Sequence, residues 1–228
     1  MHALIVLTSH DRLGETDRKT GVCLESFVHG YYACVDAGLE MTICSPLGGQ
    51  APIDAMCGCR QPAADILQRF QADRTAREDF ADALTLPQVC AADFSAVYFA
   101  DGCGALWDLA SDQAAQGLIL RLHELRRPCA FVGHGTAALL RLRGPDSAPL
   151  VSGRSIATPS RSEDEAYGLP ADAPWLEREF VSLGANCSGG PDGEPHLVQD
   201  GNWITGQNAA SSAMVARALV LAATQTII

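Results

Sequence analysis

The sequence predicts a mostly parallel α/β sheet in a single domain. Short apolar runs with strand character alternate with amphipathic helical segments, which is the pattern of βαβ units. A chain of 228 residues with 47% hydrophobic content is large enough to bury one substantial core. We therefore expect one domain over residues 1–228, with helices on the faces of the sheet.

The first strand and helix are predicted from a short apolar run and a longer periodic one. Leu4–Leu7 reads as a buried strand, and the helix after it spans about Cys23–Ala37. Gly38 follows the last periodic residue, where a glycine commonly ends a helix. A second strand is expected at Met41–Cys44.

Two further strands and a connecting helix complete the predicted parallel set. The strands are Ala96–Ala100 and Cys129–Val132, and a helix over about Gln113–Arg126 joins them. Such crossovers are normally right-handed and place the ligand crevice at the carboxyl ends of the strands.

The remaining segments depart from this alternation. Residues 51–89 are polar with helical character, and we interpret them as a helical insertion over the sheet edge, either a lid or a solvated connection. Beyond Gly144 we expect turn-rich chain with short strands near Val151–Ile156 and Leu197–Val198. A last helix is expected from about Ala209 to Ala223, with Asn208 as its N-cap.

Composition excludes several classes of partner. A formal charge of −11 and a pI near 4.8 argue against binding nucleic acid or an anionic membrane through bulk electrostatics. No apolar run approaches membrane-spanning length, and the N-terminus lacks a basic signal-like region. Nine cysteines, an odd number, favour reduced thiols over a disulfide framework. We expect a cytoplasmic protein.

A glycine at position 133 stands where the local pattern predicts a nucleophile. The strand Cys129–Val132 runs into Gly133-His134-Gly135 and then into the helical segment Thr136–Leu140. A strand, a tight turn and a helix form the elbow on which α/β hydrolytic enzymes display a Ser or Cys two residues before a glycine. Gly133 adopts such a turn at little steric cost but has no side chain for attack.

Several short motifs follow one another in a characteristic order along the chain. They are Thr8-Ser9-His10-Asp11, Lys19-Thr20-Gly21, Leu24-Glu25-Ser26-Phe27, Asp36-Ala37-Gly38, Ser45-Pro46-Leu47-Gly48-Gly49, Asp101-Gly102-Cys103-Gly104, Trp107-Asp108-Leu109, Gly133-His134-Gly135, Ser162-Glu163-Asp164-Glu165-Ala166 and Ile204-Thr205-Gly206-Gln207-Asn208. Together they resemble the DJ-1/PfpI superfamily of class I glutamine amidotransferase-like proteins, in its Hsp31-like branch of chaperones and glutathione-independent glyoxalases. The resemblance runs from residue 4 to about residue 220.

The resemblance implies a flavodoxin-like three-layer α/β sandwich, usually a homodimer, that acts on a small α-oxoaldehyde or similar small ligand. It also implies an elbow Cys followed by His, with a carboxylate from the first helix beside them. By motif, these are Gly133 in place of the Cys, then His134 and Glu25. Asp164 is the candidate to orient His134, with Glu163 or Glu165 as alternatives. Backbone N–H groups of the glycine-rich turn and elbow are expected to face an oxyanion, and the glycines concerned are Gly102, Gly104, Gly133 and Gly135.

Two departures from the family pattern concern the active site. Gly133 replaces the nucleophilic Cys, and in the glycine-rich turn Cys103 replaces the His while Asp101 replaces the first glycine. A relocated nucleophile at Cys103, with His134 as base, is one interpretation. A neutral replacement after loss of activity is the other.

The sequence offers weaker signals for other sites. Cys57-Gly58-Cys59 brings two thiols together, but a structural zinc needs four ligands and no second pair stands at suitable spacing. We expect neither a metal nor another cofactor.

Three functions remain open from the sequence. The chain is a chaperone- or stress-type relative of glyoxalase III that keeps a pocket with little or no activity, or it is a glutathione-independent glyoxalase that converts methylglyoxal to lactate through Cys103, Glu25 and His134. The third is a water-using hydrolase or hydratase with His134 as base.

Overall fold

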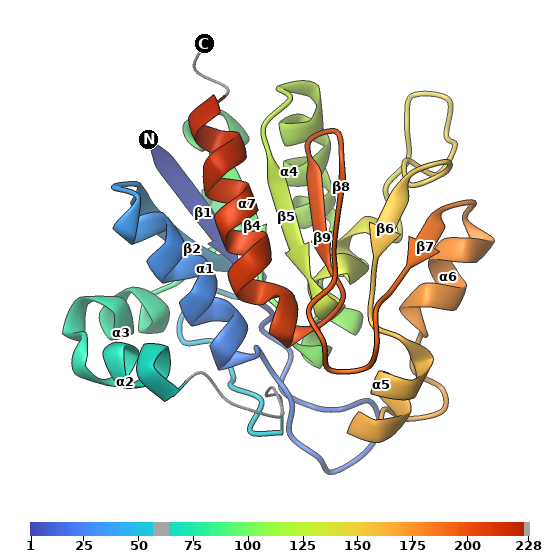
Figure 1. Ribbon diagram of the computed structural model, residues 1–228, viewed down its shortest axis with the longest axis horizontal. Helices are drawn as coiled ribbons and strands as arrows, with labels where there is room; N and C mark the ends of the chain where they lie inside the picture. Colours follow the sequence, from blue (N-terminus) through green and yellow to red (C-terminus); the bar gives the residue numbers. More distant parts are fainter. Residues whose placement is uncertain (57–63, 226–228) are drawn as a thin grey trace.

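Seven strands form the central sheet of the computed structural model, which describes residues 1–56 and 64–225 (Figure 1). Their order across the sheet is β3-β2-β1-β4-β5-β9-β8, and β8 alone runs antiparallel to its neighbour. This confirms the predicted flavodoxin-like α/β architecture. The strands are β1 (His2–Val6), β2 (Glu40–Ser45), β3 (Leu84–Thr85), β4 (Ala96–Phe99), β5 (Cys129–Val132), β8 (Leu197–Asp200) and β9 (Trp203–Gly206).

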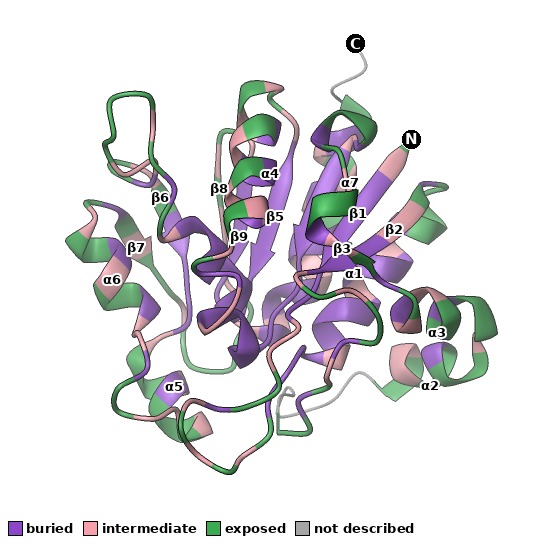
Figure 2. Cartoon of the chain, turned by 180° about the vertical axis from the view of Figure 1, so that it is seen from behind, coloured by how far each residue is buried: buried purple, intermediate pink, exposed green. Residues whose placement is uncertain are grey.

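The inner strands are buried on both faces because helices cover the sheet from both sides. All four residues of β4, β5 and β9 are buried, as expected for strands inside a covered parallel sheet. Figure 2 shows this buried sheet between helices whose outer surfaces are exposed. The four strands predicted for the parallel set are present, and their ends differ from the prediction by at most two residues.

Helices α1 (Leu24–Asp36) and α7 (Ser212–Gln225) cover one face, and α4 (Gln113–Glu124) covers the other. Helix α1 ends as the sequence predicts. Gly38 has φ +77°, and its N–H and that of Leu39 donate to the carbonyls of Val35 and Cys34. This pair of bonds is the Schellman motif, in which a left-handed residue closes the helix.

The segment 51–89 contains more than the expected helices. Helices α2 (Ala64–Ala72) and α3 (Arg74–Ala81) are followed by β3, a strand that pairs with β2 at the sheet edge. The expected helical character is present in α2 and α3, and the short strand β3 was not predicted. Phe70 and Phe80 are buried against Phe27 of α1, with ring centroids 5.8 and 4.8 Å away.

The second half of the chain differs most from the sequence-based expectation. The part read as turn-rich contains α5 (Arg161–Tyr167) and α6 (Leu176–Ser182), and β6 (Ser155–Ala157) pairs with β7 (Asn186–Ser188) in a separate small sheet. Strand β9, next to β5, was also missed.

Two predicted helices begin differently from the expectation. The elbow leads into a 3₁₀-helix over Gly133–Leu139. The expected C-terminal helix begins as a 3₁₀ turn over Ala209–Ser211 before α7. Asn208 is the predicted N-cap, since its side chain accepts a hydrogen bond from the Ser211 N–H.

Candidate active site

A cavity of about 360 Å³ opens where the sequence predicted a ligand crevice. It lies beyond the carboxyl ends of β4 and β5, and α5 forms part of its wall. Open parallel α/β sheets commonly bind ligands at this edge. The side chains that define its chemistry are Asp101, Cys103, His134, Glu163, Asp164 and Tyr167.

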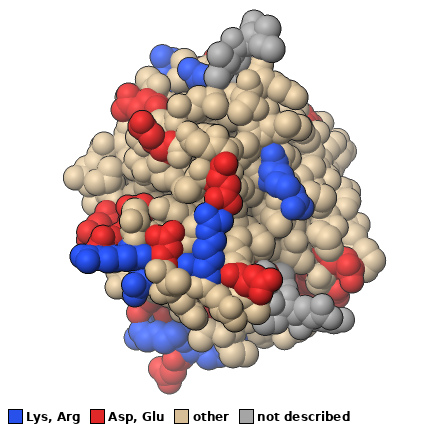
Figure 3. Space-filling view, turned by 60° about the vertical axis from the view of Figure 1, so that its left-hand side comes forward, with Lys and Arg blue, Asp and Glu red and all other residues tan. Residues whose placement is uncertain are grey.

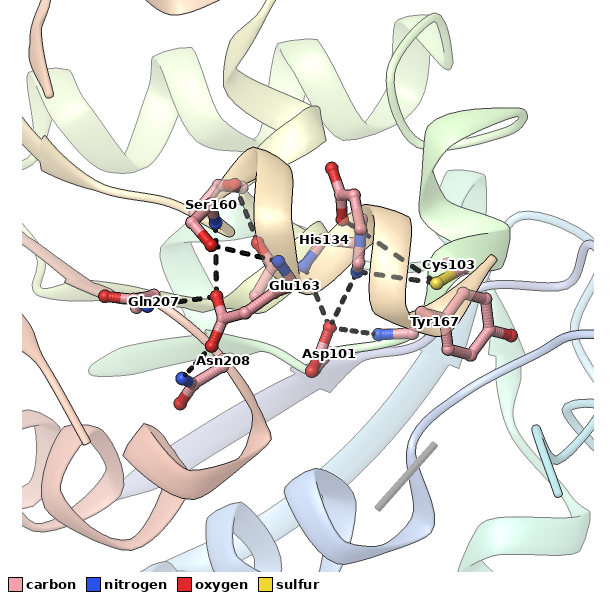
Figure 4. Close-up of polar contacts among 12 residues, drawn as sticks. Asp101, Cys103, His134, Ser160, Glu163, Tyr167, Gln207 and Asn208 are labelled. Carbon is pink, nitrogen blue, oxygen red and sulfur yellow. Dashed lines mark hydrogen bonds and ion pairs between the residues drawn. The ribbon is translucent and has the colours of Figure 1, made fainter. Parts of the chain in front are cut away.

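Asp101 is held rigidly at the centre of the site (Figure 4). The Asp101 side chain is buried, and its Oδ1 atom accepts hydrogen bonds from the backbone N–H groups of Gly102 at 2.7 Å and His134 at 2.8 Å. The Asp101 backbone N–H donates to Ser26 Oγ, and the Cys23 N–H donates to the Asp101 carbonyl. Two backbone donors that converge on one oxygen form the type of arrangement that stabilises an oxyanion. Here the chain's own carboxylate occupies it.

Gly133 and Asp101 fill one volume between them. Gly133 has φ +52°, and a Cβ atom built on it would lie 2.2 Å from Asp101 Oδ1 and 2.3 Å from its Cγ. Real Cβ atoms do not approach other atoms this closely, so no side chain fits at position 133 while Asp101 keeps this position. The two departures noted separately in the sequence are thus physically linked, because the carboxylate stands where the elbow side chain would project.

His134 lies between two carboxylates. Its Nε2 atom is 2.9 Å from Asp164 Oδ1, and its Nδ1 atom is 3.4 Å from Asp101 Oδ1. Burial opposes the charged imidazolium. Attraction to the Cys103 sulfur and to the Asp164 carboxylate, together with the hydrogen bonds to Asp101 and Asp164, outweighs burial and raises the pKa of His134 well above its ordinary value. A protonated His134 donates from both ring nitrogens and has no lone pair with which to act as a base.

Cys103 contacts His134 but is not activated by it. The Cys103 Sγ atom lies 3.6 Å from His134 Nδ1, and the residue is 2% exposed. Burial raises the pKa of the Cys103 thiol more than the neighbouring His134 lowers it, and the charges of Asp101 and Asp54 raise it further. Cys103 is therefore a protonated thiol at neutral pH, whereas nucleophilic cysteines are thiolates.

Asp164 is the member of the acidic cluster that contacts His134. Glu163 instead accepts hydrogen bonds from the side-chain amides of Gln207 at 3.0 Å and Asn208 at 2.6 Å, and also from the backbone N–H groups of Ser160 and Gly193. Figure 4 shows the bonds from Gln207 and Asn208, which tie α5 to the chain that follows β9. Glu165 pairs with Arg161 on the exposed side of α5.

Tyr167 closes the wall on the other side of the cavity. Its hydroxyl donates to Asp54, which also accepts a hydrogen bond from Thr20 Oγ1 at 2.9 Å. Asp54 is buried, and its two hydrogen bonds connect the loop around Thr20 to the end of α5. Sequence reasoning gave no role to Tyr167 or Asp54.

The other predicted site residues lie outside the cavity lining. Glu25 is buried in the first turn of α1, with Oε1 3.9 Å from His29 Nε2. Of the four glycines, Gly102 donates its N–H to Asp101, whereas Gly104 and Gly135 are packed where a Cβ would meet backbone carbonyls at 2.6 and 2.7 Å. The catalytic and oxyanion roles assigned to these residues stay predictions.

The described residues form neither a metal site nor a membrane-spanning helix. Among residues 1–56 and 64–225, no group of three or more His, Cys, Asp or Glu side chains is placed to hold a metal ion. No helix in the same ranges has the length and apolar character needed to cross a membrane. Cys57 and Cys59 lie outside the described residues.

Comparisons with known proteins give consistent results. No family model matches the chain. It is 28% identical over 193 residues to a Bos taurus protein named glutamine amidotransferase-like class 1 domain-containing protein 1, with 84% of each chain covered. The Homo sapiens protein of the same name is 26% identical over the same length.

Solved structures share the fold over nearly the whole chain. Rapid Encystment Protein 24 KDa of Francisella tularensis is 27% identical with a TM-score of 0.90, covering 98% of this chain and 99% of its own. Glyoxalase III of Candida albicans has a TM-score of 0.87 at 19% identity, with 97% of both chains covered. Drosophila melanogaster DJ-1beta has a TM-score of 0.61. The chain is thus similar in sequence to glutamine amidotransferase-like class 1 domain-containing proteins, and it has the fold of the DJ-1/PfpI structures.

Proposed function

We propose that this protein binds a small ligand in the cavity beside His134 and performs little or no thiol-dependent glyoxalase chemistry. One observation carries the proposal: the Asp101 carboxylate occupies the space of the elbow side chain and the two backbone donors next to it. A substrate oxygen would have to displace a buried carboxylate from both N–H groups. Covalent chemistry at the elbow has neither a nucleophile nor a vacant oxyanion site.

The two enzymatic alternatives have weaker support. A relocated nucleophile at Cys103 has suitable contact with His134, but burial raises the pKa of that thiol. A hydrolase or hydratase needs an unprotonated His134, whereas the surrounding charges raise its pKa. The nature of the ligand, a small α-oxoaldehyde or a similar molecule, belongs to the proposal, as do a cytoplasmic homodimer and a chaperone- or stress-type role.

The test is glutathione-free conversion of methylglyoxal to lactate by the purified protein and three variants. We expect no turnover above background in the parent or in Cys103→Ser. We expect none in Gly133→Cys either, because the Cβ of the new cysteine would collide with Asp101. The double variant Asp101→Gly with Gly133→Cys vacates the shared volume and the N–H groups, and we expect it alone to gain activity.

If the parent converts methylglyoxal and Cys103→Ser abolishes this activity, the proposal is overturned and Cys103 is the relocated nucleophile. The matched control is Cys90→Ser, because Cys90 is exposed and does not line the cavity. Turnover by the parent that survives Cys103→Ser but is lost in His134→Gln would favour the hydrolase alternative.

A further inference from the structure

A second cavity lies at the opposite end of the sheet from the candidate active site. It has a volume of about 510 Å³ and sits where β5 and β9 begin, at the upper end of the sheet in Figure 1. No Asp or Glu occurs among its described lining residues. The polar side chains that line it are His123, Arg126, Arg154 and Asn202. This basic lining is unexpected in a chain with a formal charge of −11.

Arg126 holds a backbone conformation that normally requires glycine. The N–H groups of Arg126 and Arg127 donate to the carbonyls of His123 and Leu122 and close α4 with a Schellman motif. Arg126 is its left-handed residue, with φ +54°.

The same motif ends three other helices, and each of them has glycine at this position. Helices α1, α5 and α6 use Gly38, Gly168 and Gly184, with φ between +77° and +85°. A non-glycine residue in the left-handed region is strained by about 1–2 kcal/mol. The backbone conformation of Arg126 at the end of α4 is therefore unfavourable for an arginine. A benefit from its side chain would explain why arginine is present there instead of glycine.

No ion pair within the described residues explains why an arginine stands at position 126. Arg69 and Arg74, for example, pair with Asp36 and Glu78, and Figure 3 shows a face on which several basic side chains lie directly against acidic ones. Within residues 1–56 and 64–225, the ion pairs include neither Arg126 nor Arg127. Basic residues stabilise a helix C-terminus electrostatically, but Arg121 already supplies a positive charge in the last turn of α4.

The buried nitrogen atoms that have no hydrogen-bond partner among the described residues include Trp203 Nε1, Arg127 Nε and His123 Nδ1. Of these residues His123 lines the cavity, Arg127 stands between the lining residues Arg126 and Pro128 in the chain, and Trp203 follows the lining residue Asn202. Tryptophan and arginine nitrogens only donate, and a buried donor without an acceptor costs about 1–3 kcal/mol. Trp203 lies against both His123, at 5.7 Å between ring centroids, and Arg154, whose guanidinium carbon is 4.5 Å from the Trp203 ring centroid. The missing partner is an acceptor of hydrogen bonds.

We propose that this second cavity binds the phosphate group of a small phosphorylated molecule. Guanidinium groups match phosphate oxygens in geometry, and the lining offers two of them together with an imidazole. Arg154 is held in place by its Nε, which donates to the Leu150 carbonyl, and by its ion pair with Asp200 at 3.3 Å. Arg126 therefore supplies the positive charge that no described acidic side chain pairs with. The volume falls in the range of small-molecule pockets and exceeds the need of a bare ion. The proposal is independent of the function of the first cavity.

The experiment measures affinity and stability on the same variants. Glycerol phosphate, inorganic phosphate and glycerol are titrated calorimetrically into the parent, Arg126→Gly and Arg74→Gln, at ionic strength matched with chloride. We expect Arg126→Gly to weaken binding of glycerol phosphate about tenfold or more, since bonds to charged groups are worth roughly 1.5–3 kcal/mol. In phosphate-free buffer, the same variant should melt about 2–4 °C higher than the parent, because the strain is released.

Arg74→Gln is the charge-matched control on α3 and should bind like the parent. Stronger binding of glycerol phosphate than of inorganic phosphate identifies a phosphorylated molecule as the ligand, and the reverse order identifies free phosphate. The proposal is overturned if neither binds beyond the chloride control, if glycerol binds equally well, or if Arg126→Gly binds as the parent does.

Discussion

Asp101 and Gly133 compete for one volume, and a double-mutant cycle tests this competition at the scale of single residues. Gly133 and Asp101 are both visible in the sequence, but the contact between Asp101 and position 133 was not predictable, because it depends on the separation of two strand ends that are 32 positions apart in the chain.

Gly133→Ala should destabilise the protein by about 2–4 kcal/mol, from left-handed strain together with the clash against Asp101. In an Asp101→Gly background the clash is absent, so the same substitution should cost about 1–2 kcal/mol. Urea unfolding of the four proteins gives the coupling energy. Additivity within about 0.5 kcal/mol would show that the two positions do not compete for space.

His134 makes stability depend on pH in a defined direction. The folded-state pKa of His134 is raised above its ordinary value of 6.5. Its stabilising contribution is complete below the unfolded-state pKa and is lost as pH rises toward the folded-state pKa. From pH 6.5 upward, the parent should therefore lose up to about 1.4 kcal/mol of stability per pH unit relative to Asp164→Asn. Urea unfolding at pH 6, 7 and 8 measures the difference, and parallel curves for both proteins would contradict the raised pKa.

At the scale of helices and strands, the sequence predicted segments with a clear hydrophobic pattern. It did not predict short buried strands that lack such a pattern. The helix α1 and its glycine end follow from sequence, as does β5, whose residues form an uninterrupted apolar run. Strand β9 has only four residues between turn-forming neighbours and includes Thr205 and Gly206. Its central place comes from pairing with β5 and β8, which local sequence does not encode.

Helices α2 and α3 are attached to α1 through buried aromatic rings. Phe80 is buried, and its ring lies 4.8 Å from that of Phe27. Phe80→Ala should lower the free energy of unfolding by about 3–5 kcal/mol, as expected for a large-to-small core substitution. Binding at the cavity beside His134 should persist, because neither helix lines it. A loss below about 1 kcal/mol would mean that these helices are a loosely attached lid.

At the scale of the whole molecule, both cavities depend on one covered sheet. The carboxyl ends of β4 and β5 meet at Asp101, Cys103 and His134. The amino ends of β5 and β9 hold the basic cavity at the other edge. Parallel strands separate the two sites by the length of the sheet, so each can be altered while the other is kept.

Thiol labelling should follow burial rather than position in the active site. Burial raises the pKa of Cys34 to about 12 and that of Cys187 to about 11, and it raises the pKa values of Cys44, Cys103 and Cys129 as well. Iodoacetamide reacts with thiolates that it can reach. Exposed Cys90 should therefore be labelled first, and Cys34, Cys44, Cys103 and Cys129 only as the fold opens.

Peptide mass spectrometry at mildly acidic pH gives a labelling rate for each of these cysteines, and the unfolded protein in urea supplies the reference rate for each. Equal protection of Cys103 and Cys129 would mean that the cavity thiol is as inert as a core thiol, because both would react through the same global opening. Labelling of Cys103 ahead of Cys90 would instead require a stabilised thiolate beside His134. That result would support covalent catalysis by Cys103 of the glycine-rich turn. A substrate would then have to displace the Asp101 carboxylate from its two backbone N–H groups.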